Sequence, residues 1–504
     1  MPALSNVIAD LYAAFEAYGS RPAVVVREKI TRYGELAPGV FALAAQLQRR
    51  TSSTEFVGFV CNRELCAYRA VLAIMLSGKA YVPLNPALPF ERLLKIVEVA
   101  GLRQVIVGRG GEGVARQLQN AMGEALEVID HEVPTDKASD WAMPMVSDSR
   151  PAYLLFTSGS TGEPKGVCVS HANLAAYLQY VTTAYDYGPA EVHSQTFELT
   201  FDLSVHDMMC AWTRGGSLVR MSGAELLSAP RMVNRHGITS WFSVPSLGSM
   251  LASQGGLKPG SMPSLRHSLF CGEGFPSGLA ADWAAAAPNS VVDNLYGPTE
   301  ATIAITQYRW DAIRSPAMCR HGLVPIGVPF DGQIVTVRAS DGHIVGAGER
   351  GELFLGGSQV TAGYWRDADT TARQFREYDG RRWYATGDIV EVDDAGCIHY
   401  VGRSDTQIKF RGHRIELGEI EHALRTEAGT DLALVLAWPV IDGRVDGLAG
   451  VIEGNGDTRE LRKNLRKRLP AYMVPQVLQF VESLPRNASG KLDRGATLRD
   501  LALI

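Results

Sequence analysis

The stretch TSGSTGEPKG, residues 157–166, has the composition of a phosphate-binding loop. Its glycines let backbone amides converge on an anion, its hydroxyls add donors, and its lysine adds positive charge. It is not a Walker-type loop, because proline and not glycine precedes Lys165. A polar surface turn is the alternative, since mobile loops have the same composition. The residues that would contact a polyphosphate are Thr157, Ser158, Ser160, Thr161 and Lys165.

A second glycine pattern lies at Gly108, Gly110 and Gly113, in GxGxxG spacing between a β-rich run and a helical pattern. The next β-rich run ends at Asp130, which completes the pattern of a dinucleotide-binding turn. The unit has no second nucleotide-binding half behind it, and 51 glycines make such spacings common. We therefore expect an ordinary strand–helix–strand turn. The alternative is a binding or reductase module for a nicotinamide, which titration with NADH would reveal.

Seven sequence blocks follow one another along the chain. They are FTSGSTGEPKGV, FDLSVHD (201–207), NLYGPTEAT (294–302), GELFLGG with GYW (351–365), YATGD (384–388), GRSDTQIKFRGHRIELGEIE (402–421) and LPRNASGKLDR (484–494). In this order they closely resemble the adenylate-forming superfamily, specifically the amino-acid adenylation domains of nonribosomal peptide synthesis. The resemblance covers essentially the whole chain. The stretches FDLSV, FCGE and YGPTEAT are similar to D-alanine carrier-protein ligases as well.

The resemblance implies an enzyme that uses ATP to convert an amino acid to its aminoacyl-AMP, releases pyrophosphate, and then loads the phosphopantetheine thiol of a carrier protein. This reaction brings two anions together, so cations and amide donors must surround the α-phosphate. The implied catalytic residues are Thr299, Glu300 and Lys491, and Glu300 would also hold Mg²⁺. Besides the loop above, the implied nucleotide-binding residues are Gly272, Glu273, Asn294, Tyr296, Gly297, Asp388, Tyr400 and Arg403.

Within that set, Tyr296 would stack on the adenine and Asn294 would bind its edge. Asp388 would bind the ribose hydroxyls, with Tyr400 and Arg403 nearby. Lys491 would bridge the attacking carboxylate and the α-phosphate, delivered by a moving domain that pivots near Asp405 as a hinge. The opposite orientation would bring KFRGHRIE forward for thioester formation.

Asp202 matches the family's acid that pairs with an α-ammonium, which favours an amino acid over an aryl or fatty acid. Its alternative role is to cap the helix that follows. The implied side-chain pocket is mostly apolar and has no charged residue, so we expect a small or medium neutral amino acid. Its residues are Leu203, His206, Ser243, Leu269, Cys271, Leu295, Ile303 and Ala304.

His206 departs from the aromatic residue or methionine expected at its position. It would either hydrogen-bond a substrate hydroxyl or narrow the floor of the pocket. Serine, alanine, cysteine, threonine, glycine, proline and D-alanine remain open as substrates. A D-alanine carrier-protein ligase and an acyl- or aryl-CoA ligase are the alternative functions.

The elements that must position these residues show two sequence patterns. Helical stretches and short β-rich runs alternate up to about residue 400, which predicts parallel α/β architecture, and residues 325–400 predict a small antiparallel sheet. With the resemblance, we expect an α/β fold. Residues 1–403 would form two doubly wound α/β subdomains plus a small β-barrel, and 404–504 a small α+β lid domain. The chain stops 13 residues after Lys491, which indicates a separate carrier protein.

Composition excludes several classes of protein. The net charge of -5 gives no general attraction to nucleic acid or anionic lipid. The basic stretch 460–470 has helical spacing, which predicts a solvated helix face or, alternatively, a docking patch for an acidic protein. Seven cysteines without a CxxC pair, no signal peptide and no long apolar run indicate a cytoplasmic protein without disulfides, a zinc site or a membrane span.

Overall fold

The computed structural model describes residues 6–50, 55–159, 163–378, 380–441, 444–486 and 492–501. The chain divides into two compact units, each with its own buried apolar core. The first unit comprises Met1–Pro86, Val97–Leu155 and Gly166–Ser404. The second comprises Ala87–Ile96, Phe156–Lys165 and Asp405–Ile504. The division near the C-terminal end therefore falls one residue after the predicted boundary, and two short earlier segments group with the second unit.

A nine-stranded sheet dominates the first unit, in the order β15-β14-β13-β12-β11-β9-β10-β1-β2. The five pairings from β1 to β13 are parallel, whereas β2 at one end of the sheet and β14 and β15 at the other pair antiparallel. The inner strands are buried along their length, as in parallel sheets covered on both faces, although half of the residues in SWFS (240–243) and HSLF (267–270) are polar. Its strands are β1 (Pro22–Val26), β2 (Lys29–Arg32), β9 (Val192–Gln195), β10 (Ser217–Arg220), β11 (Ser240–Ser243), β12 (His267–Phe270), β13 (Val291–Tyr296), β14 (Thr306–Arg309) and β15 (Val328–Pro329).

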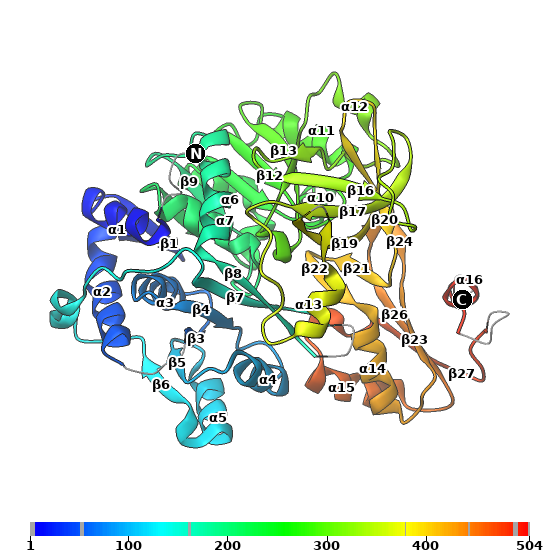
Figure 1. Ribbon diagram of the computed structural model, residues 1–504, viewed down its shortest axis with the longest axis horizontal. Helices are drawn as coiled ribbons and strands as arrows, with labels where there is room; N and C mark the ends of the chain where they lie inside the picture. The colour runs from blue at the N-terminus through cyan, green and yellow to red at the C-terminus, as the bar shows by residue number, and fades with distance from the viewer. Residues whose placement is uncertain are drawn as a thin grey trace. The chain divides into compact units, whose positions relative to one another are not determined.

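The helices associated with this sheet connect its strands. In Figure 1, α6 and α7 lie side by side, and α7 packs on β9 and β10. They are α1 (Val7–Ala17), α6 (His171–Ala184), α7 (Leu203–Trp212), α8 (Ala224–Leu227), α9 (Ala229–His236), α10 (Pro245–Ser253), α11 (Ser277–Ala286), α12 (Ser315–Met318) and the 3₁₀ turn η3 (Thr299–Ala301). Parallel strands that need crossover helices place their carboxyl ends, and the loops after them, at one edge of the sheet.

A second sheet has six strands in the order β6-β5-β3-β4-β7-β8. Its strands are β3 (Phe56–Val60), β4 (Ala80–Leu84), β5 (Gln104–Val107), β6 (Glu127–Asp130), β7 (Pro151–Thr157) and β8 (Lys165–Ser170). Its helical elements are α2 (Tyr33–Arg49), α3 (Leu65–Leu76), α4 (Phe90–Ala100), α5 (Glu112–Met122), η1 (Gly123–Ala125) and η2 (Thr135–Asp140).

The GxGxxG stretch forms the turn between β5 and α5, in a parallel strand–helix–strand unit. A Cβ on Gly108 would come within 2.8 Å of Cys61 and Cys66. A Cβ on Gly110 would come within 2.2 Å of the Asn62 side chain. These two glycines are therefore explained by close packing of the turn against its own chain.

Residues 334–403 form the antiparallel sheet that the sequence predicted, in the order β16-β17-β19-β18 with β20 also paired to β19. Its elements are β16 (Ile334–Arg338), β17 (Arg350–Gly356), α13 (Ala368–Gln374), β18 (Phe375–Tyr378), β19 (Arg381–Val392) and β20 (Ile398–Arg403). The register of β19 and β20 places Asp388 opposite Arg403.

The second unit is built from a three-stranded sheet and two main helices. The strands β23 (Ala433–Ala437), β26 (Leu448–Glu453) and β27 (Val477–Val481) pair in that order. The other elements are β21 (Gln407–Phe410), β22 (His413–Glu416), α14 (Leu417–Ala428), β24 (Val440–Ile441), β25 (Arg444–Val445), α15 (Thr458–Arg468), η4 (Ala471–Met473) and α16 (Arg494–Leu501). On α15, Leu461 and Leu465 are buried and the basic residues flank them, as the helical spacing predicted.

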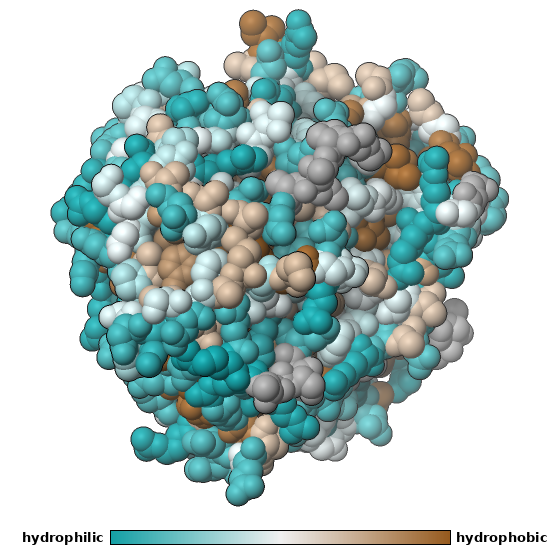
Figure 2. Space-filling view, turned by 60° about the vertical axis from the view of Figure 1, so that its left-hand side comes forward, coloured by the Kyte–Doolittle hydropathy of each residue, from teal (hydrophilic) through white to brown (hydrophobic). Residues whose placement is uncertain are grey.

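On the face shown in Figure 2, hydrophilic residues predominate and hydrophobic residues occur in small groups. Among the described helices, none combines the length and the apolar character that crossing a membrane requires.

Candidate active site

Three residues of the first unit form a hydrogen-bonded group around one carboxylate. Tyr296 ends β13, Asp388 lies in β19 and Arg403 ends β20. Tyr296 Oη donates to Asp388 Oδ2 at 2.5 Å, and Arg403 Nη1 donates to Asp388 Oδ1 at 2.6 Å. Burial and the Asp388 charge hold the pKa of Tyr296 well above its usual value, so the phenol remains a donor. This group orients a buried carboxylate with acceptor oxygens, which suits the binding of a diol.

Asn294 lies two residues before Tyr296 in β13 and is buried. Its amide nitrogen donates to the carbonyls of Val324 and Pro325, at 3.3 and 2.8 Å. A ligand that binds Asn294 would therefore have to approach the amide oxygen, which accepts but does not donate.

Glu300 lies in the turn Thr299–Ala304 and is 1% exposed. Thr302 and Ile303, which follow, have φ angles of 57° and 73°, a left-handed conformation that costs non-glycine residues about 1–3 kcal/mol each. A Cβ on Gly297 would come within 2.5 Å of Ala304 Cα, so the turn folds back closely on the end of β13. Such stored strain requires a firm anchor from the surrounding chain.

That anchor is Gln359, which the sequence analysis did not single out. Its side-chain amide donates to the carbonyls of Ala304, Ala301 and Thr302, at 2.7, 3.3 and 3.3 Å. Thr302 Oγ1 donates back to the Gln359 carbonyl at 2.6 Å. Gln359 is fully buried, so these bonds are not exchanged with water at the surface.

Asp202 stands directly before α7 and is 8% exposed. Its side chain makes no N-cap hydrogen bond, so the predicted capping alternative is not what the structure shows. Burial raises the pKa of Asp202 to about 7, and the negative charge of Glu300 adds to this, while a hydrogen bond from the Thr299 side chain lowers it. In the part of the chain that the structure describes, no lysine or arginine forms an ion pair with Asp202.

The apolar residues predicted to line the substrate pocket are all buried in the first unit. Leu203 begins α7, Leu269 lies in β12 and Leu295 in β13. The two strand residues lie in the carboxyl-terminal halves of their strands, near the edge of the sheet where ligands bind in such folds. The buried members are Leu203, Leu269, Cys271, Leu295, Ile303 and Ala304.

Ser243 was predicted as a polar residue of the substrate pocket, but its hydroxyl is hydrogen-bonded to neighbouring residues of its own chain. Its Oγ accepts from Trp241 Nε1 at 2.9 Å and donates to the Val244 carbonyl at 3.2 Å. Gly272 has a φ of 92°, which favours glycine, and Glu273 accepts the Ser246 N–H at 2.8 Å. Glu273 therefore orients the loop after β12 through a backbone contact.

His206 is fully buried in α7, and its Nδ1 lies 2.7 Å from Tyr177 Oη and 3.6 Å from Cys210 Sγ. Burial lowers the pKa of His206 to about 3, with a further contribution from His267, so the imidazole is neutral. Burial also holds the pKa of Tyr177 and of Cys210 well above their usual values, so both are protonated donors. In the tautomer whose Nδ1 accepts from these donors, the His206 hydrogen is on Nε2.

Nε2 of His206 has no hydrogen-bond partner within the described ranges. A buried N–H without an acceptor is costly, and a polar group of a bound substrate would satisfy it. Sequence reasoning found His206 but missed Tyr177, because the two lie 29 residues apart on different helices.

Tyr400 lies in β20 of the first unit. The other predicted residues belong to the second unit or lie outside the described residues. Thr157 ends β7, Ser158 follows it and Lys165 begins β8. Asp405, the predicted hinge, is the first residue of the C-terminal segment of this unit, and its Oδ1 accepts the Gln407 N–H at 3.0 Å. Ser160, Thr161 and Lys491 lie outside the described residues.

A cluster away from these residues could in principle hold a metal ion. Asp393, Cys397 and His399 place one ligand atom each within 4.8 Å of one another. However, Asp393 Oδ1 accepts the N–H groups of Ala395 and Cys397, and its Oδ2 lies 3.1 Å from His399 Nε2. Burial raises the pKa of the Cys397 thiol to about 11. These contacts stabilise the turn between β19 and β20 without a metal.

Comparison with known proteins gives matches along the whole chain. The sequence matches the family model of AMP-binding enzymes over residues 11–365 and that of the AMP-binding enzyme C-terminal domain over residues 419–491. It is 29% identical to a D-alanine–D-alanyl carrier protein ligase of Bacillus licheniformis, over 93% of this chain and 93% of the relative. It is 32% identical to an L-proline–L-prolyl-carrier protein ligase of Streptomyces coelicolor, over 94% and 93%.

A solved structure agrees with these matches. The adenylation domain AlmE of Vibrio cholerae, in complex with glycyl-adenosine-5'-phosphate, superposes with a TM-score of 0.88 at 28% identity, over 99% of this chain and 98% of that one. The predicted resemblance and the predicted α/β fold class are thereby confirmed. The first family model alone spans more than half of the chain. The chain therefore belongs to the AMP-binding enzyme family and is an adenylating ligase.

Proposed function

We propose that this ligase activates a small or medium neutral amino acid with ATP and transfers it to the phosphopantetheine thiol of a separate carrier protein. In the first step a carboxylate oxygen of the amino acid attacks the α-phosphorus, and pyrophosphate leaves. In the second step the thiol attacks the acyl carbon and AMP leaves. Two relatives named as carrier-protein ligases and a neighbour bound to glycyl-adenosine-5'-phosphate support this assignment.

The observation that carries the proposal is the buried carboxylate of Asp202. Burial alone makes its charged form costly, and a bound α-ammonium would restore that form. An aryl or fatty acid carries no such cation, so Asp202 favours an amino acid over the substrates of acyl- or aryl-CoA ligases. The apolar surroundings of Leu269, Leu295 and Ile303 favour a neutral side chain of modest size.

The nucleotide roles follow from the groups described above. Asp388, with Tyr400 and Arg403, would bind the ribose, while Tyr296 and Gly297 would lie along the adenine and Asn294 would accept from its edge. Thr299 would contact the α-phosphate. Thr157, Ser158, Ser160, Thr161 and Lys165 would surround the β- and γ-phosphates, and Lys491 would bridge the two reacting anions.

The residues present fit a Mg²⁺ ion at Glu300. A carboxylate is a hard oxygen ligand of the kind that Mg²⁺ prefers, and Glu300 is 1% exposed, where a cation stabilises the charged form. When bound, Mg²⁺ would neutralise the charge that develops on the phosphates.

The test is amino-acid-dependent pyrophosphate exchange across all proteinogenic amino acids and D-alanine. We expect exchange with a subset of small or medium neutral residues, and its loss in Asp202→Ala and Lys491→Ala while ATP still binds. Exchange supported only by aryl or fatty acids, or unaffected by Asp202→Ala, would refute the proposal. Exclusive use of D-alanine would select the D-alanine carrier-protein ligase instead, the alternative that a relative of that name favours.

A further inference from the structure

We propose that Tyr364 is a positioning residue that holds the Glu300 carboxylate in its metal-binding orientation, an inference that rests on the metal role proposed for Glu300. Tyr364 Oη donates to Glu300 Oε1 at 2.6 Å. The two side chains are 7% and 1% exposed, so water does not compete strongly for this bond. A hydrogen bond to a carboxylate is about twice as strong as one between neutral groups.

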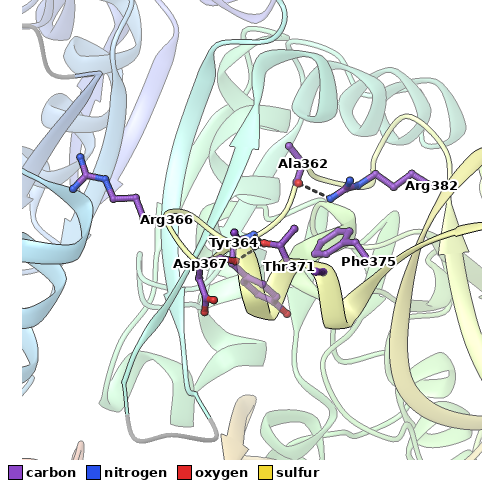
Figure 3. A pocket seen from close by; sticks show the side chains of 9 residues that line it. Ala362, Tyr364, Arg366, Asp367, Thr371, Phe375 and Arg382 are labelled. Atoms are coloured by element: carbon purple, nitrogen blue, oxygen red, sulfur yellow. Dashed lines mark hydrogen bonds between the residues drawn. The ribbon is translucent and has the colours of Figure 1, made fainter.

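The backbone and the ring of Tyr364 are held in place by neighbouring residues. Its backbone N–H donates to Thr371 Oγ1 at 2.9 Å, and that hydroxyl donates to the Asp367 carbonyl at 2.7 Å (Figure 3). The Tyr364 ring meets the edge of the Phe375 ring with centroids 5.9 Å apart. Gly363 has a φ of 129°, and a Cβ there would come within 2.4 Å of the Thr371 side chain. The start of α13 therefore fixes where the phenol points.

The same residues line a surface pocket of about 540 Å³ (Figure 3). Among these residues, Arg382 donates to the Ala362 carbonyl, and its guanidinium lies 4.6 Å from the Phe375 ring centroid. Arg382 therefore links the backbone at Ala362 to the ring that packs against Tyr364. These residues act as a scaffold for the tyrosine.

The chain between Gln359 and Tyr364 also holds the backbone at Glu300. The Thr361 N–H donates to the Glu300 carbonyl at 2.9 Å, and Gln359 bonds the carbonyls of the turn that follows. One segment therefore restrains both the main chain and the carboxylate of Glu300. Fixing both is what a metal ligand needs when its orientation must not change between turnovers.

The chemistry of a phenol suits this task. A carboxylate has two oxygens and about four acceptor positions, and the bond from Tyr364 occupies one of them. A hydrogen bond to the charged form favours that form. A neutral donor also adds no positive charge, so the attraction of Glu300 for a cation is retained, whereas a lysine or arginine in its place would cancel it. Outer-shell partners of this kind orient metal ligands in proteins generally.

The experiment compares Tyr364→Phe, Glu300→Gln and the double variant with the intact enzyme. A matched control is Tyr33→Phe, which removes a buried Tyr33 bond of 2.7 Å to the Gly216 carbonyl. One readout is the Mg²⁺ concentration that gives half-maximal pyrophosphate exchange at fixed ATP. The second does not depend on activity: the Tm with ATP and Mg²⁺ minus the Tm with ATP and EDTA.

We expect Tyr364→Phe to raise the half-maximal Mg²⁺ concentration about tenfold and to shrink the Mg²⁺-dependent Tm shift. Tyr33→Phe should change neither, and adding Tyr364→Phe to Glu300→Gln should have no further effect. A raised Mg²⁺ requirement in Glu300→Gln but a normal one in Tyr364→Phe would overturn this inference alone. A normal requirement in both variants would instead refute the metal role of Glu300.

If Tyr364→Phe yields no folded protein, Thr371→Val provides the second test. It removes the hydroxyl that anchors the Tyr364 N–H and leaves the phenol in place. A smaller rise in the Mg²⁺ requirement, with kcat at saturating Mg²⁺ little changed, would support the positioning role. A lower kcat at an unchanged Mg²⁺ requirement would show a merely structural role and overturn it.

Discussion

The buried carboxyl of Asp202 should make amino-acid binding depend on pH near neutrality. Burial raises its pKa from the ordinary 3.8 to about 7. Below that pH the carboxyl is protonated and cannot pair with a substrate ammonium. The value of kcat/KM for the amino acid, at saturating Mg·ATP, should therefore fall as the pH is lowered through about 7, because kcat/KM reports the pKa of the enzyme form that binds the amino acid.

The size of the effect follows from the pKa. At pH 6 about a tenth of the free enzyme carries the carboxylate, so kcat/KM should be about tenfold below its plateau. In the substrate complex the ammonium favours the charged form, so kcat should hold its plateau to lower pH. Pyrophosphate exchange measured between about pH 5.5 and 8.5 gives both parameters. Asp202→Asn should lose most activity, and its residual kcat/KM should lack this dependence.

The same carboxyl predicts a stability change of opposite sense. Between about pH 4 and 7 the native state holds a proton that the unfolded state has released, so the contribution of Asp202 to the free energy of unfolding falls as pH rises. The shift corresponds to at most about 4 kcal/mol above pH 7. Asp202→Asn removes this cost, so its Tm should exceed that of the wild type increasingly from pH 4 to 7. Asp136→Asn, at a side chain that is 71% exposed, is the control.

A pH-independent kcat/KM across this range, together with an Asn variant that is no more stable than the wild type, would refute the reasoning. Glu300 supplies a further check, because its charge contributes to the raised pKa of Asp202. Glu300→Gln should lower that pKa, so the loss of amino-acid binding on acidification should occur at a lower pH. The Tm shift produced by the amino acid, measured across pH, reports this without requiring turnover.

Two other predictions concern buried side chains. His206→Phe keeps an aromatic ring but removes the Nε2–H, so exchange with serine relative to alanine should fall about tenfold if the imidazole binds a substrate hydroxyl; an unchanged ratio would remove His206 from substrate recognition. Gln359→Met keeps the volume but deprives three buried carbonyls of a donor, so the free energy of unfolding should fall by about 2–4 kcal/mol in denaturant titrations. An equally stable Gln359→Met variant would show that the turn does not depend on this amide.

Local pattern was sufficient to predict most of the architecture. Alternating helical and β-rich runs predicted the parallel α/β sheets, and short strands with turns predicted an antiparallel sheet over residues 325–400, which the structure has at 334–403. The grouping of Asp388 with Arg403 was also predicted, and the register of β19 and β20 explains it. The bond from Tyr296 to Asp388 was not, because 92 residues separate the two and only the fold brings them together.

The supporting residues of the site could not be found in the same way. Tyr177, Gln359 and Tyr364 act on His206, the 301–304 turn and Glu300 through contacts between distant segments. Each is a common residue type, and the contact that carries its role joins it to a residue at least 29 positions away, so spacing carries no signal of that role. The GYW block was recognised in the sequence, but such a block identifies a family and does not show which atom its tyrosine contacts. Conversely, Ser243 looked available for substrate from its type alone, yet its hydroxyl is bonded within the chain.

The two buried acids explain why such supports are needed. Asp202 and Glu300 place like charges in one low-dielectric region, and the charge of Glu300 raises the cost of ionising Asp202. An α-ammonium and a metal ion would each neutralise one of them, whereas ATP without a metal would add negative charge to the same region. Binding energy from the two cations therefore offsets a cost that folding has already incurred. The cations offset that cost only when the carboxylates face them. Orientation by Thr299 and Tyr364 therefore determines how strongly the cations bind.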